Sequence, residues 1–300
     1  MSDATVERVL DADNHLGETP VWSAAEQALY WVNCEQPSAL HRWSPATGER
    51  RTWAMPKRVG GYALKAGARE HGGLVVVLAD GIYDLDAASS EISLKAPSPL
   101  PAHVALHETG VDRQGRLWMG AYDHHWSPAN RTSRDGALCR LDAGRLTPVV
   151  VGLSVANGLA FSPDGRILYI ADSPSRRIEA FDLDPATGEL SGRRLFVELP
   201  AGEGHIDGAT VDADGGYWLA VVGLGQLRRY RPDGTLDRAI ALPFSNPTKP
   251  AFGGPDLDVI YVTSTKLPIT QPGVAGAALN GALYAVRAGV KGLEEPLLRG

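Results

Sequence analysis

The strongest constraint on the fold is a strand-turn-strand pattern that recurs along the whole chain. The segments "VWSAAEQALYWV", "VDRQGRLWMG", "FSPDGRILYIAD", "VDADGGYWLAV" and "FGGPDLDVIYVTS" each join a short apolar strand, a polar turn and a second strand with an aromatic residue near its start. A degenerate copy, "LKAGAREHGGLVVVL", lies between the first two. Equivalent residues of the second strands are 44, 43, 51, 49 and 43 residues apart: Trp31, Val75, Trp118, Tyr169, Trp218 and Tyr261.

Six units of this length predict an all-β chain folded as a six-bladed β-propeller, with four strands in each blade. We expect residues 1–300 to form a single propeller domain, in which the N-terminal segment "TVERVL" closes the last blade as its outer strand. A β-sandwich is the main alternative, because it also consists of short strands and frequent turns. The nearly fixed spacing favours the propeller, since a sandwich needs no repeat of constant length.

Composition narrows the choice of partner and compartment. The chain has 300 residues and a net charge of -6 at pH 7, and its Lys and Arg residues are scattered, which argues against nucleic-acid binding. The acidic start "MSDATVERVLDADNH" lacks the pattern of a secretory signal, and no apolar stretch approaches the length of a membrane span. Cys34 and Cys139 lie in apolar strand-like segments, which is typical of buried free thiols. We therefore expect a reduced, cytoplasmic protein that binds neither nucleic acid nor a membrane; the sequence predicts no oligomeric state.

The first strands of the six units share a register that predicts a ring of side chains. We aligned these strands on the last apolar residue before each turn: Trp22, Leu64, Val111, Phe161, Val211 and Phe252. Since the innermost strands of a propeller all run in one direction around the channel, equivalent positions form a ring at one mouth of that channel. Four residues before the aligned ones stand Glu18, Gly60, His107, Asn157, Asp207 and Thr248.

Two carboxylates in this ring, Glu18 and Asp207, indicate a bound cation. Two carboxylates at close range cannot both stay ionised without compensation, and no Lys or Arg occupies the ring. Together with Asn157 they form an oxygen-rich site suited to one divalent metal ion, Ca²⁺, Zn²⁺, Mn²⁺ or Mg²⁺. Any one of the three alone is more often a turn or loop residue, but their shared register in three blades favours the metal site. For His107, a hydrogen-bonded channel histidine and a ligand or substrate contact both remain open.

Four segments, "LGETPVW", "ANGLAFSPDGRILYIADS", "IDGATVDADGGYWLA" and "PTKPAFGGPDLDVIYVTS", together resemble the family of senescence marker protein (regucalcin), gluconolactonase and luciferin-regenerating enzyme. The resemblance extends over nearly the whole chain. It implies a six-bladed propeller with one catalytic divalent metal ion at the channel mouth, held by Glu18, Asn157 and Asp207. It also implies hydrolysis of sugar lactones, with Asp207 as the general base.

Two segments depart from the family pattern. In "ALHETGVD", Ala105 and His107 stand where the family has an Arg and an Asn that contact the sugar hydroxyls and a metal-bound water. In "GAYDHHW", His124 or His125 stands where the family has a Glu. The metal-binding set therefore matches the family, whereas the sugar-binding set differs from it.

These observations favour a metal-dependent lactonase that opens a sugar lactone or a related cyclic ester with activated water, and with Asp207 as the proton acceptor. We predict that His107, Tyr122, His124 and Lys249 bind the substrate, although Lys249 fits equally well as a solvated surface lysine. One alternative is a metal-dependent esterase or hydrolase acting on a non-sugar ring or ester. Another is a propeller that binds a ligand without turnover and uses the ion only to hold its blades.

Overall fold

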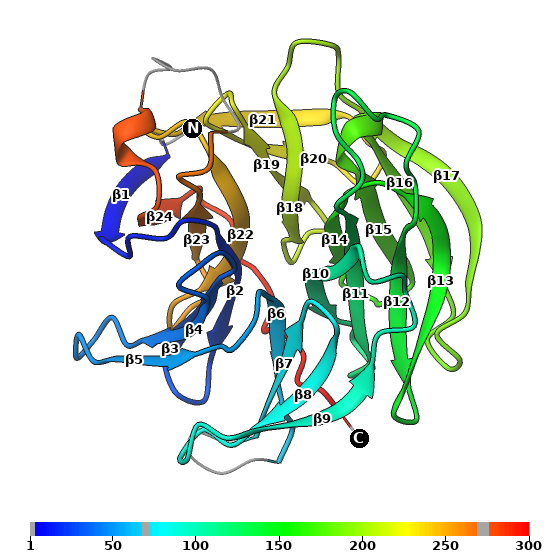
Figure 1. Ribbon diagram of the computed structural model, residues 1–300. Helices are drawn as coiled ribbons and strands as arrows, with labels where there is room; N and C mark the ends of the chain where they lie inside the picture. The colour runs from blue at the N-terminus through cyan, green and yellow to red at the C-terminus, as the bar shows by residue number, and fades with distance from the viewer. Residues whose placement is uncertain (1–3, 68–72, 269–275, 300) are drawn as a thin grey trace.

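The computed structural model describes residues 4–67, 73–268 and 276–299. These residues form six four-stranded antiparallel sheets arranged in a ring (Figure 1), which confirms the predicted six-bladed β-propeller. The turn of the degenerate repeat, at 68–72, lies outside the described residues, as do 1–3, 269–275 and Gly300. Of the described helices, both of them short, none is long and apolar enough to cross a membrane.

Each blade contains four strands that follow one another from the channel outward. The first blade consists of β2 (Gly17–Ser23), β3 (Ala28–Asn33), β4 (Ala39–Trp43) and β5 (Arg50–Ala54). The second consists of β6 (Val59–Leu64), β7 (Leu74–Leu78), β8 (Gly81–Leu85) and β9 (Ile92–Pro97). The third consists of β10 (Val104–Val111), β11 (Leu117–Asp123), β12 (Gly136–Asp142) and β13 (Arg145–Leu153).

The second half of the chain repeats this arrangement. The fourth blade consists of β14 (Ala156–Phe161), β15 (Ile167–Asp172), β16 (Arg177–Leu183) and β17 (Leu190–Glu198), with the 3-10 turn η1 (Ser173–Ser175) after β15. The fifth consists of β18 (His205–Val211), β19 (Tyr217–Val222), β20 (Gln226–Tyr230) and β21 (Leu236–Ala241). The sixth consists of β22 (Pro247–Gly253), β23 (Val259–Ser264), β24 (Leu283–Arg287) and β1 (Thr5–Leu10), with the 3-10 turn η2 (Ala277–Leu279) before β24.

The sixth blade joins the two ends of the chain. Its outer strand is β1, which pairs antiparallel with β24 in a register that places Thr5 opposite Arg287 and Val6 opposite Val286. The N-terminal segment "TVERVL" thus supplies the fourth strand of a blade whose other three strands come from the end of the chain. Hydrogen bonds between the first and last parts of the chain therefore hold the ring closed.

The repeated "VD…G…W" pattern has a local structural cause. In the turn after β10, Asp112 Oδ1 accepts hydrogen bonds from the backbone N–H groups of Gln114 and Arg116, and its Oδ2 accepts one from Trp118 Nε1 at 3.0 Å. In the turn after β18, Asp212 bonds the backbone in the same way and accepts from Trp218 Nε1 at 2.8 Å. The Asp shapes the hairpin and the buried Trp anchors it, which explains why both residue types recur in the third and fifth blades.

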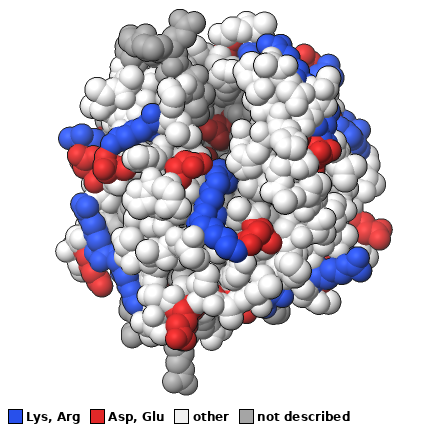
Figure 2. All heavy atoms as spheres, in the orientation of Figure 1, with Lys and Arg blue, Asp and Glu red and all other residues white. Residues whose placement is uncertain are grey.

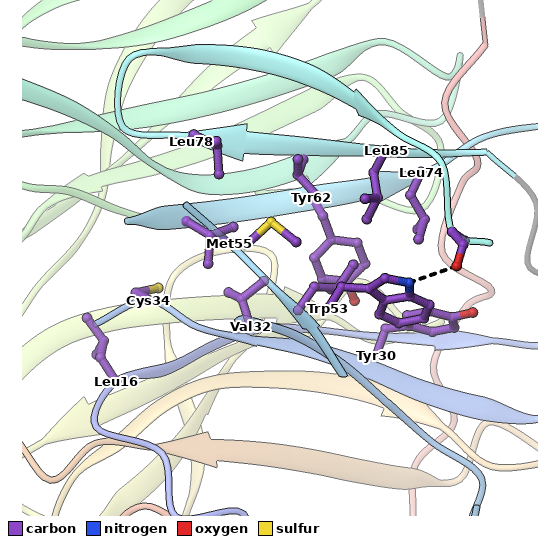
Figure 3. Packing of buried hydrophobic residues seen from close by; sticks show 14 of the residues in the cluster. Leu16, Tyr30, Val32, Cys34, Trp53, Met55, Tyr62, Leu74, Leu78 and Leu85 are labelled. Carbon is purple, nitrogen blue, oxygen red and sulfur yellow. Dashed lines mark hydrogen bonds between the residues drawn. The ribbon is translucent and has the colours of Figure 1, made fainter. Parts of the chain in front are cut away.

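Apolar clusters fill the spaces between neighbouring blades. The cluster between the first and second blades packs Tyr30, Val32 and Trp53 against Tyr62 and residues of β7 (Figure 3), and Trp53 Nε1 donates to Ala87 O at 3.0 Å. Equivalent clusters lie between the other neighbouring blades, including the sixth and the first. Cys34 and Cys139 are buried free thiols in two different clusters. Burial of these side chains keeps the inner strands in place around the channel.

Candidate active site

The six inner strands all change register at the predicted ring. Each pairs regularly with its neighbour, and each contains a bulge or irregularity beside the ring position: at Glu18, Gly60, His107, Asn157, Asp207 and Thr248. In three of them a residue with positive φ follows, Thr19 at 47°, Glu108 at 39° and Gly158 at 65°. Because a bulge bends a strand and redirects its side chains, the repeated irregularity accounts for polar side chains turned toward the channel.

Glu18, Asn157 and Asp207 are buried and line one cavity of about 740 Å³ at an end of the channel. We call these three residues the floor of the cavity. Figure 2 shows acidic atoms deep in a hollow on this face of the molecule. The structure therefore brings together the three residues that were predicted to bind a metal ion.

The two floor carboxylates repel each other and are poorly solvated. Burial, followed by the nearby charge of Glu108, raises the pKa of Glu18 to about 8. Burial, followed by the charge of Glu18, holds the pKa of Asp207 well above its usual range. Glu18 Oε2 accepts from the Thr19 N–H at 3.1 Å, but Glu18 Oε1 is buried with no hydrogen-bond partner among the described residues. Such a site stabilises added positive charge.

Ser173 fixes the orientation of the Asn157 amide. Its hydroxyl oxygen lies 2.7 Å from the Ile206 carbonyl oxygen and 2.9 Å from the Asn157 amide. A hydroxyl has one hydrogen, and a carbonyl oxygen can only accept, so Ser173 donates to Ile206 and accepts from Asn157 Nδ2. The amide oxygen of Asn157 then faces Asp207 Oδ1 at 3.2 Å. The opposite orientation lets the amide nitrogen donate to Asp207 Oδ1 at 3.2 Å and to Ala156 O at 3.3 Å, but Ser173 then donates to Asn157 and gives up its short bond to Ile206.

The floor residues fit a divalent cation. Asn157 Oδ1 and Asp207 Oδ1 face each other without a hydrogen between them, unless Asp207 carries a proton. Glu18 Oε1 is a third buried oxygen that lacks a partner in the described part of the chain. Carboxylate and amide oxygens are the ligands that Ca²⁺, Mg²⁺ and Mn²⁺ prefer, and carboxylates also bind Zn²⁺.

The predicted substrate-binding residues lie in two places. His107, Tyr122 and His124 line the same cavity as the floor. His107 is buried, its Nδ1 has no partner among the described residues, and its pKa is held well below the usual value by burial and by the charges of Arg58 and Lys249. The Tyr122 and His124 rings meet edge to face with centroids 4.5 Å apart. These three side chains therefore face the same space as the floor.

Lys249 does not line this cavity. Its ammonium donates to Glu108 Oε1 at 3.1 Å and to the Thr109 carbonyl at 3.2 Å, and both charged side chains are buried. Lys249 instead lines a smaller cavity of about 60 Å³ further along the channel. Gly208 makes room for it, since a Cβ atom at that position would lie 2.5 Å from Lys249 Cγ. The structure thus places Lys249 in an ion pair beside the floor rather than facing the substrate cavity.

Two histidines at residues 124 and 125 point different ways. His124 lines the cavity, whereas the His125 ring stacks on His103 with centroids 3.8 Å apart. His103, Asp123 and His125 could together hold a metal ion. However, Asp123 already accepts from His125 N, Ser133 Oγ and Asp135 N, and parallel stacked imidazoles aim poorly at one shared ion. This cluster braces the connection between β11 and β12.

Comparison with known proteins identifies the family. Residues 16–266 match the family described as SMP-30/Gluconolactonase/LRE-like region. The chain belongs to this family. A 6-deoxy-6-sulfogluconolactonase of Pseudomonas putida is 38% identical over 299 residues, with 99% of each chain covered. A pentonolactonase of Haloferax volcanii is 33% identical over 265 residues, covering 87% of this chain and 85% of the relative.

A solved structure of the SMP-30/gluconolactonase/LRE-like type has the same fold. The calcium-binding protein regucalcin from Agrobacterium tumefaciens superposes with a TM-score of 0.88 at 26% identity, and the match covers 98% of this chain and 97% of that one. The family resemblance read from the sequence is therefore confirmed.

Several residues of the cavity lie outside the family-like motifs and were not predicted. Glu35, Arg58 and Trp126 line it from connections between strands, and we call these three residues, with Tyr122 and His124, the rim. No register relates the connections of different blades, so the sequence offers no signal for them. Ser173 is the last residue of the motif "ANGLAFSPDGRILYIADS", yet its role was not predicted because it depends on a contact with another blade, at Ile206.

Proposed function

We propose that this protein hydrolyses a lactone with one divalent cation held by Glu18, Asn157 and Asp207. The gathering of these three buried side chains around one cavity carries the proposal, because Glu18 Oε1 has no hydrogen-bond partner among the described residues and two carboxylates meet there. Membership of a family whose relatives are named lactonases supports this class of reaction. The cavity of about 740 Å³ has room for a sugar-sized ring.

When bound, such a cation polarises the lactone carbonyl and lowers the pKa of a water. Asp207 accepts the proton of the attacking water as the water oxygen bonds to the carbonyl carbon. The bond from the carbonyl carbon to the ring oxygen breaks, and the proton passes from Asp207 to that oxygen, which gives a hydroxy acid. Glu18 supplies the second negative charge of the floor, and Ser173 keeps the Asn157 amide oxygen turned inward.

His107, Tyr122 and His124 position the substrate in this proposal. They line the cavity beside the floor, and Ala105 lies opposite Tyr122 in the pairing of β10 with β11. A small residue at this position leaves space for an aromatic wall. The substrate is therefore held by imidazole and phenol groups in this part of the cavity.

The test is a pH-indicator hydrolysis screen of the metal-stripped protein with each of Ca²⁺, Zn²⁺, Mn²⁺ and Mg²⁺ added. The panel contains sugar lactones, a gluconolactone with a sulfonate at C6, aliphatic lactones and aryl esters. We expect lactone hydrolysis that requires an added ion. Asp207→Asn should lose about 10³-fold or more in kcat/KM and bind the ion more weakly.

Asp214→Asn is the matched control, because Asp214 is an exposed carboxylate in the turn that follows the same strand. It should keep wild-type activity, and thermal unfolding should show both variants folded. Full activity of Asp207→Asn, or of stripped protein free of metal by elemental analysis, would contradict the mechanism. Activity confined to aryl esters would contradict the lactone assignment.

A further inference from the structure

A cationic side chain enters the cavity from outside the ring. Arg58 directly precedes β6 and lines the cavity, with a side chain that is 16% exposed. Its Nε donates to Glu35 Oε1 at 3.0 Å. Its Nη1 is buried and has no hydrogen-bond partner among the described residues. The guanidinium is therefore held along one edge, while part of its donor set remains unused.

An unused donor on a buried cation is costly unless a ligand satisfies it. A buried N–H without an acceptor is destabilising, and a guanidinium has a planar fork of donors that matches the oxygens of carboxylate, sulfonate or phosphate groups. Glu35 is 38% exposed and lines the same cavity, so it orients the guanidinium without enclosing it.

The charges of the cavity are arranged in two zones. The floor is acidic and fits a cation, whereas Arg58 supplies a fixed positive charge at the rim. The same charge, after burial, lowers the pKa of both His107 and His124, which places the three groups close to one space. A substrate that spans both zones has its reacting carbonyl over the floor and its negative end at the rim.

From this arrangement we propose that Arg58, oriented by Glu35, binds an anionic substituent of the lactone, a carboxylate or a sulfonate on a carbon away from the reacting ester. This inference rests on the proposed function and names the class of its substrate. Arg58 thereby determines which substrates are preferred, since it contacts the substituent and not the reacting atoms.

The experiment compares kcat/KM of the metal-loaded protein for three lactones: gluconolactone, its C6-sulfonate analogue and a glucarolactone with a free carboxylate. We expect wild type to prefer at least one anionic lactone to the neutral one. Arg58→Gln should lower kcat/KM for that lactone by about 10- to 100-fold and change the neutral one by less than about threefold. The anionic lactone with the higher kcat/KM shows whether the preferred substituent is a sulfonate or a carboxylate.

Three further variants sharpen the test. Glu35→Gln keeps an oxygen that can accept from Arg58 Nε but removes the competing negative charge, so a folded variant should raise kcat/KM for anionic lactones severalfold. Arg58→Lys keeps the charge but loses the fork, so it should retain only part of the preference. Lys57→Gln is the matched control, because Lys57 is exposed, pairs with Asp80 and does not line the cavity; it should change nothing.

Equal turnover of neutral and anionic lactones by wild type, or an equal effect of Arg58→Gln on both, would overturn the inference and leave the proposed function standing. Absence of all lactone hydrolysis would instead overturn the proposed function. Thermal unfolding of each variant separates loss of recognition from loss of fold. A folded Arg58→Gln that keeps the anionic preference is decisive against the assignment.

Discussion

The floor and the rim of the cavity are built by different means. Glu18, Asn157 and Asp207 occupy equivalent positions on the inner strands of three blades, next to the same irregularity in strand pairing. Glu35 and Arg58 come from the connections between β3 and β4 and between β5 and β6. The floor is therefore fixed by the repeat, whereas the rim can change without disturbing it. We therefore expect substitutions in the connections to change the choice of substrate more readily than the reaction chemistry.

We expect the largest change in stability when the ion pair beside the floor is broken. Lys249→Met removes the partner of buried Glu108 and leaves its carboxylate without compensating charge. We expect a loss of about 3–5 kcal/mol in the free energy of unfolding, measured by urea denaturation. The double variant Lys249→Met with Glu108→Gln should recover most of it, because Gln still accepts from the Leu159 N–H that now bonds Glu108 Oε1.

The same double variant tests the sequence-based prediction that Lys249 contacts the substrate. If Lys249 belongs only to the interior pair, the double variant binds substrate with a KM close to wild type. A large rise in KM in a stable double variant would return Lys249 to the substrate-binding set. A Lys249→Met protein as stable as wild type would show that the pair does not hold the inner strands.

The next prediction concerns how the stability of the metal-stripped protein depends on pH through Glu18. In metal-stripped protein the pKa of Glu18 is raised to about 8, whereas in the unfolded chain it is about 4.3. Between these values the unfolded chain releases the proton and the folded protein keeps it, so the stability of stripped protein falls as pH rises. The loss is complete above about pH 8.

A bound cation favours the ionised carboxylate, so the rise in unfolding midpoint on adding Ca²⁺ should be larger at pH 8 than at pH 5. Calorimetry of stripped and loaded protein measures it. Glu18→Gln should flatten the pH dependence of the stripped protein and remove most of the Ca²⁺ effect. Glu91→Gln serves as the control, because Glu91 is an exposed carboxylate that directly precedes β9. Equal stability of stripped wild type at both pH values would disprove the assignment.

The contrast between floor and rim also explains what could be read from the sequence. The spacing of the repeats predicted the blades, and counting back four residues found Glu18, Asn157 and Asp207, because a propeller repeats its inner strand in a constant register. The pair of Lys249 with Glu108 could not be predicted, since it joins residues 141 positions apart whose contact depends on side-chain packing in the channel. Arg58 and Glu35 meet across two connections, and no repeated position marks them.

The smallest predicted effect concerns Ser173, which belongs to a connection but acts on the floor. Ser173→Ala removes the acceptor for Asn157 Nδ2, so the amide can turn and donate to Asp207. Loss of such a supporting contact typically weakens metal binding, and we expect about a 10-fold weaker affinity for Ca²⁺ by titration calorimetry. Ser175→Ala is the matched control, because Ser175 lies in the same 3-10 turn and donates to the Asp172 carbonyl at 2.7 Å.

Ion affinity within about twofold of wild type in a folded Ser173→Ala protein would mean that another contact orients Asn157. A weaker affinity for Ca²⁺ in Ser173→Ala, with the affinity of Ser175→Ala unchanged, would instead show that a residue of this turn supports the floor. One side chain of a connection would then support a ligand of the repeated ring, through a hydroxyl that bonds from the fourth blade to the fifth. Connections between strands would therefore influence metal binding as well as substrate choice wherever they bond to an inner strand of the next blade.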